Sequence, residues 1–342
     1  MAVFLSVKEL LSGAESAGLE LWEYVLRASA DETGISTERS WAQMAARLEA
    51  MKKADASYDA GMRSHSGLTG GDGAKMDAYA ANGGGICGEF IDGILAAALR
   101  MGECNACMHC IVAAPTAGAC GVLPAVLLPY GSRYDLSDDT LIKALYVASG
   151  FGAVIAQRAS ISGAEAGCQA EVGVACAMAA GAATFLMGGS TEQIEYAAGM
   201  AIEHMLGLTC DPVKGLVQVP CIERNAMAAG RALECAEYAL MTNTFHLISY
   251  DEVLMTMILT GEDIEDSLRE TSRAGLAQTY NLDDMARKQR LQELKSQLMG
   301  LKRRGSISMK WGDENATENA DESDVSSGII DLNHSSTSDL FV

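Results

Sequence analysis

Residues 172–189 read VGVACAMAAGAATFLMGG, an uncharged stretch nearly long enough to cross a bilayer as a helix. Alanine and glycine gain little on entering lipid, however, and Glu171 and Glu192 flank the stretch closely. We therefore expect a helix buried in the core of a soluble protein, with neighbouring helices packed closely against its small side chains, and no membrane span.

The composition of the chain extends this expectation to the whole fold. Hydrophobic residues make up 49% of the 342 residues and aromatic residues only 6%, while Ala, Gly and Met are abundant. Runs of β-branched and aromatic residues, which are typical of strands, are nearly absent. The sequence predicts an all-α protein, with a single domain of close-packed helices over residues 1–282.

Start and stop signals place individual helices within this domain. Ser137 before two acidic residues is typical of a helix N-terminus, and Ser190 with Gln193 forms a capping-box pattern. The predicted helices are, in chain order, an amphipathic segment to about residue 55 with a break near Asp31–Ser36, a helix from the turn Asn82–Gly85 to about Met101, a helix from Thr140 to about Ala159, a helix from Ser190 to about Gly207, and a helix from Ile222 to about Asn243.

The C-terminal part of the chain has a different composition. Residues 283–304 carry leucines among Lys and Arg and predict a basic amphipathic helix, whereas residues 305–342 predict a disordered acidic tail. The formal net charge of −20 argues against nucleic-acid binding, which needs a basic surface. No basic segment precedes the first apolar residues, so we expect no signal peptide and a cytoplasmic protein whose ten cysteines are reduced thiols or metal ligands.

Three cysteines lie in surroundings that suit a metal centre. Cys168 lies in a stretch of small residues, and Cys210 and Cys221 bracket a short loop rich in turn residues. Three thiolates that converge on an inorganic centre would leave one coordination position open, as catalysis requires. Cys221 also falls at a predicted helix N-terminus, where free N–H groups and the helix dipole lower the pKa of a thiol.

A second set of cysteines competes for this role. Cys104, Cys107 and Cys110 form a C-x-x-C-x-x-C run similar to a ferredoxin cluster loop, with His109 beside it. The next cysteine, Cys120, is followed by glycine where a ferredoxin loop has proline. The run also ends a predicted helix, where a spacing of three residues places the thiols on one buried face. We therefore favour a packing role for these cysteines.

Four segments together resemble the alpha subunit, or catalytic domain, of iron–sulfur L-serine dehydratases. The segments are Ser66-Gly67-Leu68-Thr69-Gly70-Gly71, Ala114-Pro115-Thr116-Ala117-Gly118, residues 163–171, and residues 219–225. The resemblance runs from about Tyr58 to Gly261. It implies a [4Fe–4S] cluster held by Cys168, Cys210 and Cys221, and it leaves the run at Cys104 outside the ligand set.

The resemblance also implies an activity, the conversion of L-serine to pyruvate and ammonia. The open iron would polarise the hydroxyl leaving group as a Lewis acid, and a base would remove the Cα proton. The expected substrate contacts are Ser66, Gly67, Thr69, Gly70, Gly71 and Thr116, since a glycine-rich loop offers main-chain N–H groups to a carboxylate. Candidates for the base are His65, Lys75 and His204, although a structural histidine is the more common role for His204.

Several alternatives remain open at this point. An iron–sulfur lyase of the same fold could act on L-cysteine, and a non-catalytic subunit could bind the same cluster. A pyridoxal-phosphate enzyme is disfavoured, because the domain has few lysines and no pattern of a parallel sheet. In the family a regulatory domain is either fused or supplied as a beta subunit, so we expect a beta-subunit partner, a homo-oligomer, or both.

The fourth ligand of the resting cluster is also left open by the sequence. The family can place a C-terminal cysteine on the open iron, whereas this sequence ends in Leu340-Phe341-Val342. The resting fourth ligand of the cluster is therefore not assigned by the resemblance.

Overall fold

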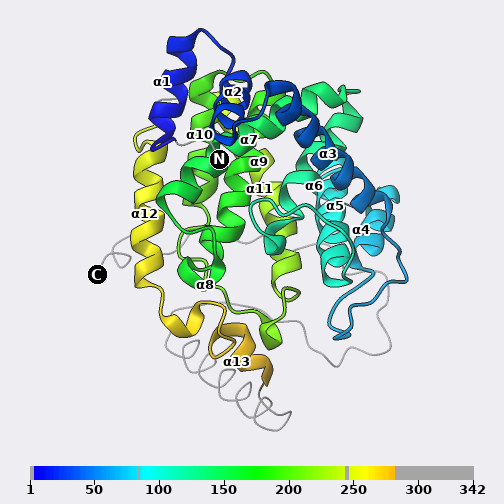
Figure 1. The fold of residues 1–342 in the computed structure, drawn as a ribbon. Coiled ribbons are helices and arrows are strands. Elements are labelled where there is room, and N and C mark those ends of the chain that lie inside the picture. The colour runs from blue at the N-terminus through cyan, green and yellow to red at the C-terminus, as the bar shows by residue number, and fades with distance from the viewer. Residues whose placement is uncertain (1–3, 84, 243–245, 282–342) are drawn as a thin grey trace, which may run out of the picture. The chain divides into compact units, whose positions relative to one another are not determined.

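The computed structural model describes residues 4–83, 85–242 and 246–281, and these residues form a helical array (Figure 1). The helices are α1 (Val7–Ala17), α2 (Leu21–Thr33), α3 (Thr37–Ala56), α4 (Asp72–Ala81), α5 (Glu89–Ala106), α6 (Val122–Arg133), α7 (Asp138–Arg158), α8 (Gly163–Ala166), α9 (Val174–Leu186), α10 (Thr191–Glu203), α11 (Cys221–Thr242), α12 (Tyr250–Asp263) and α13 (Gly275–Asn281). No β-strand occurs among the described residues, and the all-α prediction is confirmed. The predicted basic helix over 283–304 and the acidic tail over 305–342 lie outside the described residues.

Helix α9, from the stretch 172–189, lies at the centre of the core. It packs against α6, α7, α10 and α11, and every residue from Val174 to Thr184 is buried. Small side chains are needed here, because a Cβ added at Gly181 would lie 3.3 Å from the ring of Phe151 on α7. The small side chains of α9 therefore determine how closely the neighbouring helices approach it.

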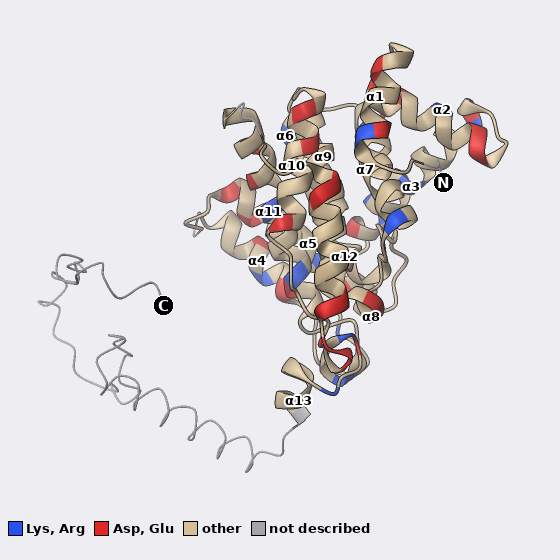
Figure 2. Cartoon of the chain, turned by 90° about the vertical axis from the view of Figure 1, so that its left-hand side faces the viewer, with Lys and Arg blue, Asp and Glu red and all other residues tan. Residues whose placement is uncertain are grey.

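Two helical segments, Asp138–Arg158 and Gln169–Leu186, are long and apolar enough to cross a membrane. Their most apolar windows are 67% and 83% buried within the protein, however, and the core helix of a soluble protein has the same length and composition. Figure 2 shows Lys and Arg residues interspersed with Asp and Glu residues along the helices, with no long basic stripe in that view.

The predicted helix boundaries agree with the structure where a capping residue marks them. The hydroxyl of Ser137 accepts from the main-chain N–H of Thr140, and Ser190 and Gln193 form both hydrogen bonds of the capping box. The N-terminal segment divides into three helices, with Gly34 in the left-handed conformation between α2 and α3. Helix α5 begins later and ends later than expected, at Glu89 and Ala106.

The cysteine run at the end of α5 does not form the single buried face that its spacing predicted. Cys104 is fully buried, Cys107 is half-buried and Cys110 is exposed. The physical reason is that α5 ends at Ala106, so the helical spacing does not continue to Cys110. Only the first of these thiols has the packing role expected for the run.

Candidate functional site

The three cysteines of the predicted centre lie outside the helix interiors. Cys168 follows α8, Cys210 lies in the loop after α10, and Cys221 is the first residue of α11. Their exposed fractions are 0%, 3% and 5%, in that order. The fold therefore buries three thiols that come from separate segments of the chain.

A carboxylate lies close to two of these thiols. One ligand atom each from Cys168, Cys210 and Glu171 lies within 4.8 Å of the others. Glu171 is half-buried and belongs to a π-helical turn, Gln169–Gly173, that links Cys168 to α9. π-Helical turns of this kind occur often at functional sites. The Thr116 hydroxyl donates a hydrogen bond to Glu171.

Hydrogen bonding and charge distinguish Cys168 from the other two thiols. A hydrogen bond from the Cys210 thiol, together with the positive charge of Arg224, lowers the pKa of Cys168. Donation of that hydrogen bond and burial raise the pKa of Cys210 well above its ordinary value. Cys168 is thus the thiol best prepared to be a thiolate before any metal binds.

Cys221 lies at a helix N-terminus as predicted, but its pKa is not lowered. Burial, followed by the charge of Cys168, raises the pKa of Cys221 to about 12. Desolvation of a buried thiolate therefore outweighs the helix dipole at this position. A metal that binds here would have to displace the proton of Cys221.

Arg224, one turn into α11, holds the cysteine loops together. Its guanidinium donates to Cys168 Sγ at 3.3 Å, to the Thr209 carbonyl at 2.7 Å and to the Asp211 carboxylate at 2.8 Å. Asp211 is 5% exposed and also accepts from the main-chain N–H of Leu276 at 2.8 Å. A buried ion pair with these extra hydrogen bonds fixes the orientation of the loop that carries Cys210.

The segment after α12 covers the Cys210 loop from the outside. The main-chain N–H of Cys210 donates to Leu268 at 2.8 Å, and the N–H of Glu270 donates to the Cys210 carbonyl at 2.6 Å. Ser272 donates to the Pro212 carbonyl at 2.9 Å. These bonds hold the backbone on both sides of Cys210.

Two glycines make the space beside the thiols. A Cβ added at Gly163 would lie 2.8 Å from Cys210 Sγ, and one added at Gly118 would lie 2.5 Å from a Glu171 carboxylate oxygen. Both distances are shorter than a non-bonded contact allows. The small-residue composition around Cys168, noted in the sequence, therefore has a direct steric cause at the site.

The predicted substrate loop is joined to the cysteine loop by Gln218. The side-chain carbonyl of Gln218 accepts from Ser64 Oγ at 3.0 Å and from Ser66 Oγ at 2.6 Å. Ser66 Oγ in turn accepts from the N–H of Leu68 at 3.2 Å. The Ser66 hydroxyl proton is therefore engaged with Gln218. The N–H groups of Gly67 and Thr69 donate to the Ser64 carbonyl at 2.9 Å and to Ser64 Oγ at 3.3 Å, so Gly70 and Gly71 carry the loop N–H groups without a protein acceptor among the described residues.

The end of this loop is fixed by the buried carboxylate of Glu103 on α5. It accepts from the main-chain N–H groups of Asp72 at 2.7 Å and Gly73 at 3.2 Å, and from the Tyr58 hydroxyl at 2.6 Å. Gly70 and Gly71 precede this helix start with positive φ angles of 136° and 84°. Glycine is favoured at both positions because other residues rarely adopt this backbone conformation.

The candidate bases differ in their surroundings. Lys75 is exposed and forms a 2.6 Å ion pair with Asp72, so its charge is directed to the surface of α4. His65 is exposed and lies between the two serines that bind Gln218. His204 caps α10, and its Nδ1 lies 2.8 Å from the Met200 carbonyl, as in an ordinary structural histidine.

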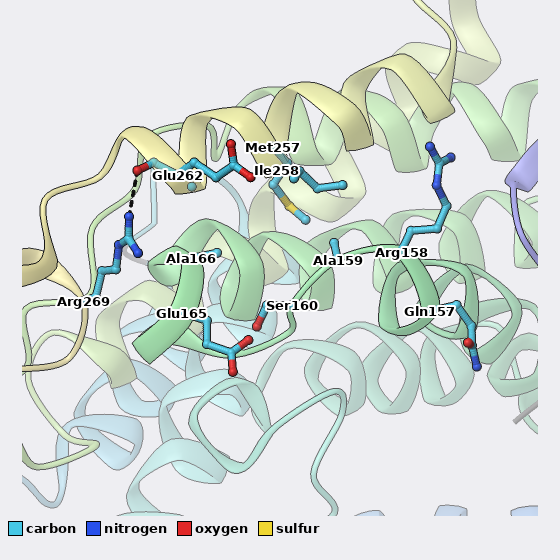
Figure 3. A pocket seen from close by; sticks show the side chains of 11 residues that line it. Gln157, Arg158, Ala159, Ser160, Glu165, Ala166, Met257, Ile258, Glu262 and Arg269 are labelled. Atoms are coloured by element: carbon cyan, nitrogen blue, oxygen red, sulfur yellow. Dashed lines mark hydrogen bonds between the residues drawn. The ribbon is translucent and has the colours of Figure 1, made fainter.

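An open pocket of about 420 Å³ lies beside α8, with Glu165 and Ala166 in its lining (Figure 3). Met257, Ile258 and Glu262 of α12 line one side of it, and the guanidinium of Arg269 donates to the Glu262 carbonyl at 2.8 Å. None of the three cysteines lines this pocket. It is therefore separate from the group of thiols.

Comparison with known proteins places the chain in a family. A family model described as serine dehydratase alpha chain matches residues 16–277. The chain belongs to the serine dehydratase alpha chain family. A protein from Bacillus subtilis (strain 168) named "Probable L-serine dehydratase, alpha chain" is 39% identical over 277 residues, which cover 81% of this chain and 92% of that protein.

Longer relatives match over a shorter region. L-serine dehydratase TdcG of Escherichia coli (strain K12) is 50% identical over 188 residues, which cover 55% of this chain and 41% of that protein. An L-serine dehydratase of Streptomyces coelicolor is 50% identical over 181 residues, which cover 53% of this chain and 40% of that protein. The chain thus spans about two fifths of the length of these two relatives.

Glu171, Gln218 and Arg224 do not stand out as site residues in the sequence. A signal existed for Glu171, because the spacing Cys168-x-x-Glu171 places both side chains within one turn of a helical segment. Arg224 similarly follows Cys221 by three residues. The contact of Gln218 with Ser66 joins residues far apart in the sequence and had no local signal.

Proposed function

We propose that this chain is the alpha chain of an L-serine dehydratase, a carbon–oxygen lyase that converts L-serine to pyruvate and ammonia. The observation that carries the proposal is the approach of Cys168, Cys210 and the Glu171 carboxylate to within 4.8 Å of one another, with a third buried thiol, Cys221, outside that group. Membership of the serine dehydratase alpha chain family and relatives named L-serine dehydratase support the substrate.

The donor set fits an iron–sulfur cluster. Cys168, Cys210 and Cys221 would hold it through soft thiolate sulfur, and Gly163 and Gly118 keep the adjoining space free of Cβ atoms. A [4Fe–4S] cluster bound through three thiolates supplies an open iron that acts as a Lewis acid toward a hydroxyl oxygen. The raised pKa of Cys221 predicts that cluster assembly releases a proton there.

The residues around this centre would bind and orient the amino acid. Main-chain N–H groups of Gly70 and Gly71 would grip the substrate carboxylate. Ser66, Gly67 and Thr69 would shape the loop around it, because their hydroxyl or N–H protons are engaged with Gln218 and Ser64. Thr116 forms the opposing wall, since its hydroxyl reaches the Glu171 carboxylate beside Cys168. The contact of Gln218 with the loop serines would set the distance between the carboxylate loop and the cysteines.

For the base we propose His65 rather than Lys75. His65 lies on the loop that Gln218 anchors, so its position is tied to the segment that carries Cys221. Lys75 is paired with Asp72 on α4. Removal of the Cα proton by the imidazole requires the neutral form of the histidine.

The cluster assignment is tested by anaerobic purification and by analysis of iron and sulfide in single alanine variants. We expect Cys168→Ala, Cys210→Ala and Cys221→Ala to lose most of the iron. Cys235→Ala, which removes an equally buried thiol on α11, and Cys107→Ala are expected to keep it. Retention of a full cluster in the first three variants, with loss in Cys107→Ala, would show that the ligand assignment is wrong.

The substrate is tested on the same preparations. We expect pyruvate to form from L-serine faster than from L-cysteine, and sulfide release as the faster reaction would identify a cysteine-specific lyase instead. We also propose a beta-subunit partner, a homo-oligomer, or both, in the cytoplasm. Co-expression with a beta chain and size-exclusion chromatography test this assembly.

A further inference from the structure

The geometry points to Glu171 as the resting fourth ligand of the cluster, a carboxylate that L-serine displaces from the open iron. This inference rests on the proposed function, since it requires a cluster bound by Cys168, Cys210 and Cys221. It adds a fourth donor residue to the centre and a step that precedes catalysis.

The position of Glu171 is the first argument. Its carboxylate lies within 4.8 Å of the ligand atoms of both Cys168 and Cys210, and these three residues are the only group of this kind among the described residues. The cysteines are almost fully buried, whereas Glu171 is half-buried. Of the donors at the site, Glu171 is therefore the residue with the largest exposed fraction.

The surroundings of the carboxylate are the second argument. Gly118 leaves no room for a Cβ, since an added atom would lie 2.5 Å from one carboxylate oxygen. A Cβ at Gly163 would lie 3.5 Å from the other oxygen. Thr116 donates to the first oxygen, which leaves the second oxygen without a protein hydrogen bond among the described residues. One oxygen is thus oriented by Thr116 while the other is available to a metal.

The backbone at Glu171 is the third argument. A regular α-helix would continue from α9 toward Cys168, but the structure has a π-helical turn over Gln169–Gly173. A π-helical turn adds one residue to the helical repeat and so changes which side chains share a face with Cys168. The turn directs Glu171 to the thiols, although burial there raises the pKa of its carboxyl group.

The chemistry of the donor matches a position that must exchange. Carboxylate oxygen is a harder ligand than thiolate sulfur, and it binds a soft iron–sulfur site less tightly than cysteine does. On binding of L-serine, the bond from a Glu171 oxygen to iron would be exchanged for a bond from the substrate hydroxyl oxygen. No electron is transferred, and the released carboxylate keeps its hydrogen bond from Thr116.

The test compares Glu171→Gln with Glu270→Gln in anaerobically purified protein. Glu270 is a matched control, because its exposed carboxylate also acts electrostatically on Cys210 but does not belong to the group within 4.8 Å. We expect Glu171→Gln to lose one iron on limited oxidation about tenfold faster than the wild type, as for loss of a group that supports a metal. Glu270→Gln is expected to lose iron at the wild-type rate.

Mössbauer spectra of ⁵⁷Fe-labelled protein provide a readout that is independent of activity. We expect the spectrum of one iron to differ between the wild type and Glu171→Gln, and we expect L-serine to shift that same iron in the wild type. Identical resting spectra and identical rates of iron loss would overturn the inference and would assign the fourth position to solvent.

A measurement on unaltered protein covers the case in which Glu171→Gln assembles no cluster. Wild-type protein labelled with ¹³C-carboxyl glutamate should show a carbon hyperfine coupling to the reduced cluster, which Glu270→Gln retains and L-serine abolishes. Absence of the coupling in a protein with a full cluster overturns the inference alone. Absence of iron and sulfide from the wild type would instead overturn the proposed function.

Discussion

Replacement of Asn225 by alanine should destabilise the protein through hydrogen bonds that join two loops of the site. Asn225 is 1% exposed, and its side-chain carbonyl accepts from the N–H of Gly121 at 2.8 Å. Its amide donates to the carbonyls of Gly118 at 2.6 Å and Cys221 at 2.7 Å. One buried side chain therefore ties the loop after Thr116 to the first turn of α11.

The magnitude follows from the groups that lose their partner. The alanine variant leaves the Gly121 N–H and the Gly118 carbonyl without the side chain that binds them, and each such buried group costs about 1–3 kcal/mol. We therefore expect the free energy of unfolding to fall by about 4 kcal/mol, which is large for a single substitution. The same variant should hold less iron, because Gly118 would no longer be fixed beside Glu171.

Urea unfolding followed by circular dichroism measures this change. Asn105→Ala is the matched control, since Asn105 is only half-buried and makes one exposed hydrogen bond, from its amide to the Ala117 carbonyl at 3.0 Å. We expect that control to cost less than about 1 kcal/mol. A difference of under about 1 kcal/mol between the two variants would refute the argument that Asn225 holds the loops together.

Two further substitutions test the space and the alignment of the site. Gly163→Ala should reduce the iron content by more than half while the helix content is unchanged, because its Cβ would lie 2.8 Å from Cys210 Sγ. Gly93→Ala is the control and should keep full iron, because no atom lies within 4 Å of the added Cβ. Gln218→Ala should raise the KM for L-serine about tenfold, equivalent to about 1.4 kcal/mol, with a smaller change in kcat. Gln218→Glu keeps an acceptor for the two loop serines and should restore most of the affinity, and an equal loss in both variants would contradict a positioning role.

The sequence was sufficient to predict the helical class and much of the helix pattern. The stretch 172–189 became the buried helix α9 because its small side chains allow four neighbouring helices to pack against it. The caps at Ser137 and Ser190 were predictable because each depends on residues three positions apart. These features depend on residues close together in the sequence, so they can be predicted without knowledge of the tertiary structure.

The protonation of the thiols could not be predicted in the same way. Placement of Cys221 at a helix N-terminus is a local feature and was correct, but the pKa of its thiol depends on burial by the rest of the fold. Cys168 has the lowered pKa instead, because Cys210 and Arg224 reach it from other segments. The pKa of each thiol depends on its desolvation and on nearby charges, and both are set by the way these segments pack together.

This division explains why Glu171, which we propose as a fourth ligand, did not stand out in the sequence. Three cysteines attract attention because thiols are distinctive ligands, whereas glutamates are common and most of them lie on solvated helix faces. Glu171 is set apart by tertiary features, namely the π-helical turn, the glycine at position 118 and the hydroxyl of Thr116. Gly118 and Thr116 affect Glu171 only when the fold brings the loop after Pro115 beside it. A site that needed only a vacant position for L-serine could have a small side chain at residue 171. The carboxylate that Thr116 orients beside Cys168 and Cys210 therefore indicates a role for Glu171 as a ligand.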